Sequence, residues 1–373
     1  MPTDPDDALA FLAVSVQGVD FARQVVYAEV EDNDRLIDRA QVILEDQHGA
    51  LGDLPREGQT LKLDLGWVSE HAVLFEGDII RVITEAYGSS TRRLTLVALD
   101  PAYRLMQGAP KTRDHNGAVS SIVQSIVGEY SLPVGQIQLD TDPTITPEQP
   151  LRQTNKKDWA FIQDVANRYG ARAFVEYNEG AAKFYMVSDA RLVQGDATGE
   201  LSYSGGPGQL IEFRYERVAA SAAPVRTAIT VDPTTGDEIT APAPTPTPPE
   251  PPPAADSIRA DVLGELGTQG DDYTKALQEM GKATRTPDQQ RPQTILSGLP
   301  SDPTLPDRAT LTDPTRVLGL HGEGLAVGTV KLRAKGKVSI KGIVNWADGD
   351  WYVRQVRHIV AEQNYWTRFV VTK

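Results

Sequence analysis

The sequence predicts a mainly β protein in which two β-rich units flank a small α+β unit. Apolar and polar residues alternate through residues 9–100 and again near the C-terminus, as they do in half-buried strands. Between these regions, two stretches carry the 3.6-residue apolar spacing of helices. The stretch "APAPTPTPPEPPP" at 241–253 interrupts the second half and predicts an extended spacer.

The first β unit shows its clearest strand at "TLKLDL", where Leu61, Leu63 and Leu65 point to one face. Gly77, inside a long apolar run, predicts a bulge or a sharp bend. Antiparallel strands at this density favour a small barrel or sandwich. Similar strand patterns occupy residues 25–31, 39–46, 72–87 and 92–99.

The middle of the chain predicts two helices. One covers 116–130, with Asn116 as its cap, and the other covers 155–170, with Asn155 as its cap. Asp158 follows Asn155 in capping-box spacing. The apolar faces consist of Val119, Ile122, Val123, Ile126, Val127 and Tyr130 in the first helix and of Trp159, Ile162, Ala166 and Tyr169 in the second.

A hairpin follows the second helix. Gly170 is expected to end that helix, and residues 171–188 predict two strands that turn at 178–180. Residues 110–190 are therefore expected to form an α+β unit. The remaining patterns are strands at 208–218, 328–336, 337–346, 351–363 and 365–372, partial helical character at 256–283, and a polar loop at 284–316.

Charge and cysteine content exclude several classes of function. Lys and Arg total 37 against 51 Asp and Glu, a net charge of −14, which argues against a nucleic-acid-binding face and against adhesion to anionic lipid. The chain has no cysteine, so disulfides and thiol catalysis are excluded. Without a basic signal region or an apolar run of about 20 residues, we expect a protein made in the cytoplasm and not anchored in a membrane.

No residue pattern predicts catalysis, a cofactor or a metal site. The five histidines (48, 71, 115, 321 and 358) lack metal-ligand spacing, and His358 shares an apolar strand face, which favours a structural role. The stretch "GEGLAVGTVK" departs from the P-loop pattern. The acidic clusters at 31–35 and 347–351 lack the glycine and the final glutamate of an EF-hand and are interpreted as solvated turns.

Four segments in order carry a resemblance to a known family. They are "LFEGDIIRV" with "LTLVALDPAYRLMQG", then "VSSIVQSIVGEYSL", then "LRQTNKKDWAFIQDVANRYGARAFVEYNEGAAKFY", and finally "ADGDWYVRQVRHIVAEQNYWTRFVV". Together they span about residues 70–373. They resemble the phage late-control D family, the baseplate hub proteins of contractile tails, which is similar to the N-terminal half of VgrG spike proteins.

The resemblance implies a domain order. A first tail-tube-like β-barrel would occupy 1–108, and an α+β middle domain would occupy 109–200. A second tube-like barrel would combine 201–240 with 310–373. Residues 241–309 would then form a proline-rich linker with a partly helical insertion.

The resemblance also implies a structural function. Three chains would form a pseudo-sixfold ring that adapts a sixfold tail tube to a threefold spike in the baseplate of a phage tail or an injection particle. Because the chain ends soon after the second β unit, a separate spike protein is expected, together with the tube protein and other baseplate components. The helix at 155–170 would buttress the ring. The interface is expected to use Trp351, Tyr352, Tyr365 and Trp366.

Charge and tryptophan content leave further expectations and alternatives. The acidic balance fits a ring whose lumen is net negative, through which cargo slides. A tail-associated peptidoglycan hydrolase would need a cleft with paired carboxylates or a metal. A monomeric carbohydrate-binding, adhesin-like β protein would use the tryptophans, Trp159, Trp346, Trp351 and Trp366, which core or interface roles explain better.

Overall fold

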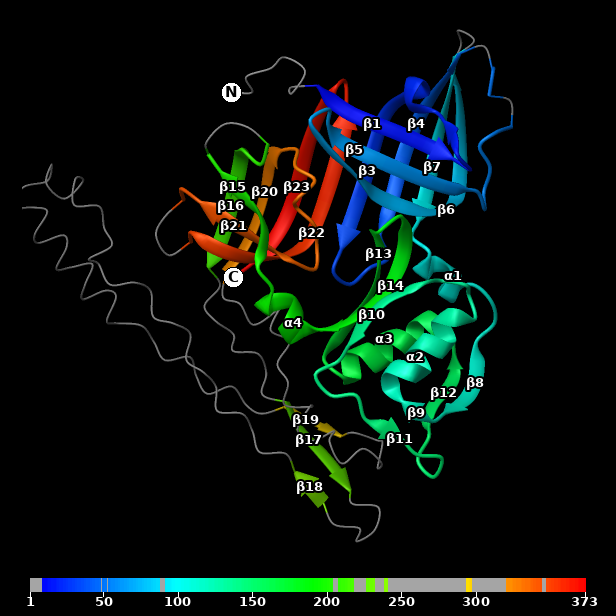
Figure 1. The fold of residues 1–373 in the computed structure, drawn as a ribbon, viewed down its shortest axis with the longest axis vertical. Helices are drawn as coiled ribbons and strands as arrows, with labels where there is room; N and C mark the ends of the chain where they lie inside the picture. The colour runs from blue at the N-terminus through cyan, green and yellow to red at the C-terminus, as the bar shows by residue number, and fades with distance from the viewer. Residues whose placement is uncertain are drawn as a thin grey trace, which may run out of the picture.

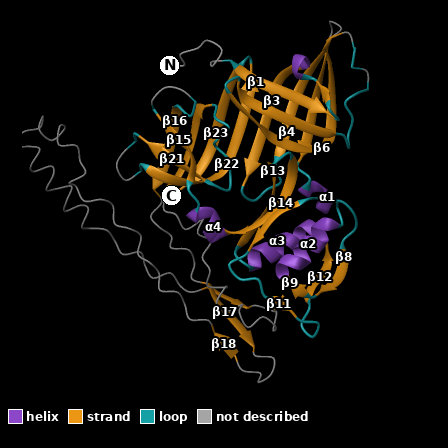
Figure 2. Cartoon of the chain, viewed as in Figure 1, coloured by secondary structure: helices purple, strands orange, loops and turns teal. Residues whose placement is uncertain are grey.

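A thirteen-stranded sheet runs through both β-rich parts of the chain, and an α+β unit lies below it in the view of Figures 1 and 2. This computed structural model confirms the mainly β class. No helix among the placed residues is long and apolar enough to cross a membrane. The structure describes residues 9–47, 49–51, 53–87, 91–203, 207–217, 226–231, 238–240, 293–296, 320–343 and 347–373.

The first half of the sheet agrees with the predicted strands. Leu61, Leu63 and Leu65 are fully buried in one apolar core, as their alternation predicts. A single 3-10 turn, η2 (Ala22–Gln24), precedes the third strand. The strands are β1 (Ala10–Val16), β2 (Val19–Asp20), β3 (Val25–Asn33), β4 (Arg39–Gln47), β5 (Thr60–Trp67), β6 (Glu70–Tyr87) and β7 (Thr91–Leu99).

Strand β6 bends between two bulges. Leu74 is skipped in its pairing with β5, and Ile80 is skipped in its pairing with β7. Gly77, predicted to mark a bulge or a sharp bend, lies between the two bulges and is itself paired with Leu61. A Cβ at Gly77 would lie 2.2 Å from the carbonyl oxygen of Leu99, so only glycine allows this close approach of β7.

The second half of the sheet has its own apolar core, which includes Trp351 and Phe369. The predicted strand at 328–336 is wrong, because these residues form a loop, and the strand lies just before them. The strands are β15 (Ala197–Ser202), β16 (Leu210–Arg217), β20 (Leu320–Val327), β21 (Lys337–Lys341), β22 (Gly349–Ala361) and β23 (Asn364–Thr372).

A separate three-stranded sheet lies outside these cores. It consists of β17 (Arg226–Val231), β18 (Glu238–Thr240) and β19 (Gln293–Leu296). Of the expected second β unit at 201–240, the large sheet therefore takes only the part up to Arg217 among the residues that are placed. The proline-rich stretch at 241–253, the helical stretch at 256–283 and the loop at 284–316 lie outside the described residues, apart from β19.

The α+β unit packs two helices against a hairpin around a third apolar core. Both predicted apolar faces are confirmed, since Val123, Ile162 and Ala166 are fully buried. The predicted hairpin is confirmed, with Glu179 and Gly180 at its turn. The elements are α1 (Ala102–Met106), β8 (Lys111–His115), β9 (Gly117–Ala118), α2 (Val119–Gly128), β10 (Val134–Gln138), β11 (Thr144–Ile145), β12 (Leu151–Lys156), α3 (Asp158–Arg168), β13 (Ala171–Asn178), β14 (Ala181–Ser188) and α4 (Asp189–Gln194).

The predicted caps of both helices are wrong. The residue before α2 is Ala118 rather than Asn116, and the helix start is held by Asp142, which accepts hydrogen bonds from the backbone N–H and the hydroxyl of Ser120 at 2.9 and 2.5 Å. The residue before α3 is Lys157 rather than Asn155. For α2, the carboxylate of Asp142, from the loop between β10 and β11, therefore takes the place of the predicted local cap. At the other end, Gly170 follows the last turn of α3 with a φ of +59°, as predicted.

The two halves of the sheet repeat the same four-stranded antiparallel unit. In sheet order, β3-β4-β7-β6 corresponds to β16-β20-β23-β22. The extra residue Val26 in β3 matches Ile211 in β16, and Ile80 in β6 matches Arg354 in β22. Matching bulges at two positions show that the units share register as well as strand order. β5 and β21 then pair with equivalent parts of β6 and β22.

Candidate functional site

The seam between the two repeated units is formed by β3 and β22. These strands pair antiparallel from Gln355 opposite Asn33 to Ala361 opposite Tyr27. Through this pairing, eight strands form one strip in the order β16-β20-β23-β22-β3-β4-β7-β6. The seam therefore fixes how one unit is placed relative to the other, because a sheet pair leaves little freedom of rotation.

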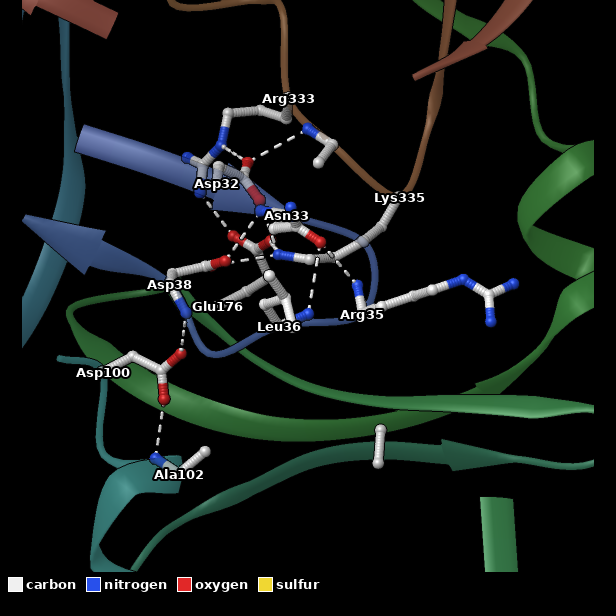
Figure 3. Close-up of polar contacts among 12 residues, drawn as sticks. Asp32, Asn33, Arg35, Leu36, Asp38, Asp100, Ala102, Glu176, Arg333 and Lys335 are labelled. Atoms are coloured by element: carbon white, nitrogen blue, oxygen red, sulfur yellow. Dashed lines mark hydrogen bonds and ion pairs between the residues drawn. The ribbon is translucent and has the colours of Figure 1, made fainter. Parts of the chain in front are cut away.

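A cluster of charged side chains, the junction cluster, lies at one end of this seam (Figure 3). It consists of Asp32, Asp38, Glu176, Arg333 and Lys335. The Nζ of Lys335 donates to Asp32 at 2.6 Å, to Asp38 at 3.0 Å and to Glu176 at 2.6 Å. The Lys335 side chain is only 3% exposed, so its ammonium group is surrounded by carboxylates rather than by water.

Two of the carboxylates, Asp32 and Asp38, come from the end of β3 and from the turn that leads to β4. The Asn33 side chain accepts the backbone N–H groups of Arg35 and Leu36, at 3.0 and 3.2 Å, which closes the turn. Asp38 in turn accepts the N–H of Asn33 at 2.8 Å. These local bonds hold Asp32 and Asp38 side by side, as Figure 3 shows.

The cations of the cluster come from the loop between β20 and β21. The guanidinium of Arg333 donates to Asp32 at 3.0 Å and also pairs with Glu176. The backbone N–H of Ala334 reaches Asp32 as well, at 3.0 Å. Lys335 has a φ of +66°, a left-handed conformation that no strand would allow. The loop therefore departs from strand geometry where its charges bind.

Asp100 extends the network to the α+β unit. It accepts the backbone N–H of Asp38 at 2.8 Å and that of Ala102, at the start of α1, at 2.7 Å (Figure 3). Glu176 belongs to β13, so the hairpin joins the cluster from another side. One buried group of charges thus connects both sheet halves and the α+β unit.

The ionisation of the cluster follows from burial and from the cations. Burial would raise the pKa of Asp32, but the charges of Lys335 and Arg333 hold it well below its usual range. Burial raises the pKa of Asp38 and brings that of Asp100 to about 7. Burial would lower the pKa of Lys335, yet the surrounding carboxylates raise it well above its usual value. Lys335 therefore stays charged.

The chemistry of the junction cluster favours a structural role over metal binding or catalysis. Asp32, Asp38 and Glu176 place their oxygens within 4.8 Å of one another, a spacing that could hold a metal ion. The ammonium of Lys335 already lies among these oxygens and supplies the positive charge. Each charged group is engaged with another, so the cluster positions backbone rather than presenting a nucleophile or a base to a substrate.

The sequence interpretation of residues 31–35 as a solvated turn was wrong. Asp32 is 1% exposed and Asp34 is 3% exposed. The sequence did not show the partner of Asp32, since Lys335 lies about 300 residues away in the chain and in a segment that resembles a strand. The same interpretation of 347–351 holds only in part: Asp348 accepts the N–H groups of Gly342 and Ile343 in a turn, but Gly349 begins β22 and Trp351 is fully buried.

The hairpin of β13 and β14 contacts both sheet halves. The Nζ of Lys62, on β5, donates to the Tyr177 hydroxyl at 2.7 Å, and Glu76, on β6, accepts the N–H of Ala182 at 3.5 Å. The neighbouring Glu176 binds the loop of the second half. Helix α3 packs on β13 and supports it from behind. The helix and hairpin therefore serve as a packing module within the chain.

The aromatic residues expected at a subunit interface mostly lie inside the chain. Trp351, Tyr352 and Tyr365 are at most 1% exposed, and Trp351 donates to the carbonyl of Ala347 at 2.8 Å. Trp366 is half-buried. The expectation is wrong for the first three, because a side chain enclosed in its own core has no surface to offer a partner.

The remaining predictions for tryptophan and histidine residues concern core positions. Trp159 is buried in the core of the α+β unit, which fits a core role, while Trp346 and His48 lie outside the described residues. His358 is fully buried, and its Nδ1 lies 2.7 Å from the Tyr365 hydroxyl. Burial lowers the pKa of His358 to about 3, so it is a neutral core residue, as its apolar strand face predicts.

Both ends of the eight-strand strip have an open edge. Of the strands that the structure describes, β16 pairs with β20 alone. β6 pairs with β5 only up to Asp78, and beyond that point the N–H of Val82 donates to the Glu57 side chain rather than to a strand. Exposed apolar side chains lie at both edges, Ile83 at 38% and Ile211 at 51%. Open edges of this kind are sites for pairing with another chain.

The face of the strip beside β16 carries charges of both signs. A groove of about 350 Å³ there is lined by the arginines Arg214, Arg357 and Arg368 and by the glutamates Glu212 and Glu323. Arg357 pairs across the seam with Glu31 at 3.4 Å. These charges lie on the side of the sheet away from the second core, so this face is exposed to solvent.

Solved structures with the same fold exist, although no family model and no curated protein matches the chain. A tail protein from Neisseria meningitidis MC58 matches with a TM-score of 0.64 at 11% identity, over 98% of this chain and 96% of that one. The 43 kDa tail protein of prophage MuSo2 from Shewanella oneidensis matches with a TM-score of 0.64 at 10% identity, over 98% of both chains.

A third match comes from a secretion system. An E. coli component of the type VI secretion system, described as structurally similar to T4 bacteriophage tail proteins, has a TM-score of 0.57 at 9% identity. It covers 96% of this chain and 76% of that one. At such low identities, the likeness shows that this chain has the mainly β fold of these tail proteins.

Proposed function

We propose that the chain is a structural hub protein in the baseplate of a contractile phage tail or a related injection system. Three copies close into a ring that joins a sixfold tail tube to a threefold spike. The expected partners are therefore two further copies of the chain, a separate spike protein, the tube protein and other baseplate components. Catalysis, cofactors, nucleic-acid recognition and membrane anchoring have no part in this role.

The observation that carries the proposal is the repeated sheet unit with one seam inside the chain and open edges at both ends. Two repeats per chain and three chains make six repeats, which matches the sixfold symmetry of a tube. The same ring keeps true threefold symmetry, which matches a trimeric spike. Heterologous contacts between an edge and a different edge close into rings when the rotation permits.

The fold comparisons support a role in a tail or a related injection system. Two of the similar structures are described as tail proteins and another as a component of type VI secretion. The junction cluster supports the same role, because a ring of six repeats requires the two repeats of one chain to keep a fixed angle. The buried position of Trp159 and Trp351 gives the adhesin alternative no support from those two residues.

The mass of the purified chain in solution tests the proposal, measured by light scattering after size exclusion. A mass near three times 40.6 kDa is expected. If the chain alone is monomeric, the measurement is repeated with the spike and tube proteins encoded beside it. A chain that stays monomeric with both partners present contradicts the ring. A strongly basic lumen in an assembled trimer would contradict the expected negative lumen but not the ring itself.

A further inference from the structure

We infer that the open edge of β6 pairs antiparallel with the open edge of β16 in a second copy of the chain, in a register that sets Glu85 opposite Arg214. This inference rests on the proposed ring and specifies its subunit contact. The two edges lie at opposite ends of one strip, so each copy offers one edge to each neighbour.

The internal repeat determines the register. In the seam inside the chain, Ile359 of β22 lies opposite Glu29 of β3. Ile359 follows the bulge residue Arg354 by five positions, as Glu85 follows Ile80.

The partner strand obeys the same rule. Glu29 follows the bulge residue Val26 by three positions, as Arg214 follows Ile211. If neighbouring copies repeat the seam found inside the chain, Glu85 therefore lies opposite Arg214 of the next copy. The same arithmetic sets Ile83 opposite Glu216, the equivalent of Arg357 opposite Glu31.

Charge and size agree with this register. Glu85 is exposed, and the Arg214 side chain is 75% exposed and lies 3.9 Å from the carboxylate of Glu323. An opposite-charge pair directly across two antiparallel strands is favourable. Arg81 would lie diagonally across from Glu216 and adds a second opposite-charge contact. A shift by one residue would turn every side chain of one edge to the wrong face.

Within one chain, the open edge of β6 is covered by a side chain rather than by a strand. Among the described residues, the N–H of Val82 donates to the side chain of Glu57, on an exposed turn, at 3.2 Å. A β16 strand arriving there replaces one side-chain bond by a ladder of backbone bonds. It also covers the part of the β6 edge around Ile83, which is otherwise exposed.

Cysteine cross-linking tests the register, because the native chain has no cysteine. Directly opposed residues bring their Cβ atoms about 4.5–5.5 Å apart, close enough for a disulfide after small adjustment. The variant with Glu85→Cys and Arg214→Cys is expected to give covalent trimers under mild oxidation, seen on a non-reducing gel. The control with Ile83→Cys and Arg214→Cys shares the face but is two residues out of register, and at least tenfold less cross-linking is expected.

The outcomes separate the register from the ring. Stronger cross-linking in the Ile83→Cys control overturns the register. A trimer by light scattering that cross-links in neither variant overturns the edge pairing and leaves the ring standing. A chain that stays monomeric with its spike and tube partners overturns both.

Charge reversal gives an independent measurement on the assembled trimer. Glu85→Arg or Arg214→Glu alone is expected to weaken each subunit contact roughly fivefold, since opposed like charges are unfavourable by up to about 1 kcal/mol. The double variant restores the opposite-charge pair in reversed order and is expected to recover most of the association. Equal weakening in the single and double variants contradicts the contact between these two residues.

Discussion

Replacing Lys335 by methionine tests the role of the junction cluster most directly. The change keeps an unbranched side chain, one atom shorter, and removes an ammonium group that lies within 3.0 Å of three carboxylates. The side chain is 3% exposed, so water cannot solvate the carboxylates that lose their cation. Breaking a buried charge cluster by removing one partner costs about 3–5 kcal/mol. We therefore expect the unfolding midpoint to fall by roughly 5 °C.

The pH dependence of this variant gives a second readout. Without Lys335, the carboxylates repel one another and gain from binding protons. Asp38 and Asp100 already have raised pKa values, about 7 for Asp100, because they are buried. The stability lost in Lys335→Met should therefore be smaller at pH 5 than at pH 8.

Lys331→Met is the matched control in the same loop. Lys331 pairs with Glu70 at 2.9 Å, but its side chain is 56% exposed. Solvent screens such a pair, and its loss should cost less than about 1 kcal/mol. Denaturant unfolding of both variants decides the matter. If Lys335→Met costs no more than Lys331→Met at pH 8, the cluster does not hold the two sheet halves together.

Two further predictions concern the cores. Gly77→Ala should lower the unfolding free energy by at least about 2 kcal/mol, because its Cβ would collide with the Leu99 carbonyl. The control Gly128→Ala, whose Cβ would meet nothing within 4 Å, should be neutral or stabilising. Denaturant unfolding measures both variants. His358 has a folded pKa of about 3 against about 6.5 unfolded, so its contribution to stability is complete above pH 6.5 and is lost as pH falls toward 3, by up to about 1.4 kcal/mol per unit. His358→Gln should flatten that part of the stability curve, and an unchanged slope would contradict the neutral core assignment.

Strand and helix positions followed closely from local patterns. The alternation of Leu61, Leu63 and Leu65 predicted a half-buried strand, and the apolar face around Ile162 predicted a buried helix. These signals are local, because the period of the backbone sets which side chains share a face. The resemblance added the order of the units, and the mainly β fold agrees with it. The domain boundaries and the acidic lumen stay predictions.

The candidate site could not be predicted in the same way. Asp32 stands in a polar run that is typical of an exposed turn, and Lys335 in an alternating run that is typical of a strand. Their burial depends on a contact between residues about 300 positions apart. The prediction that Trp351 and Tyr352 lie at a subunit interface was wrong for a related reason. An aromatic residue on a strand suits a core and an interface equally well.

The sequence by itself determined which segments become strands and helices and which of their faces are apolar, since both depend on neighbours within a few residues. Only the tertiary structure decided that β3 pairs with β22, that the three carboxylates and two cations of the junction cluster meet beside this seam, and that the edges of β6 and β16 stay open among the described strands. Pairing between distant strands depends on loop closure and on the match of charges across space. Neither quantity has a period that can be read along the chain.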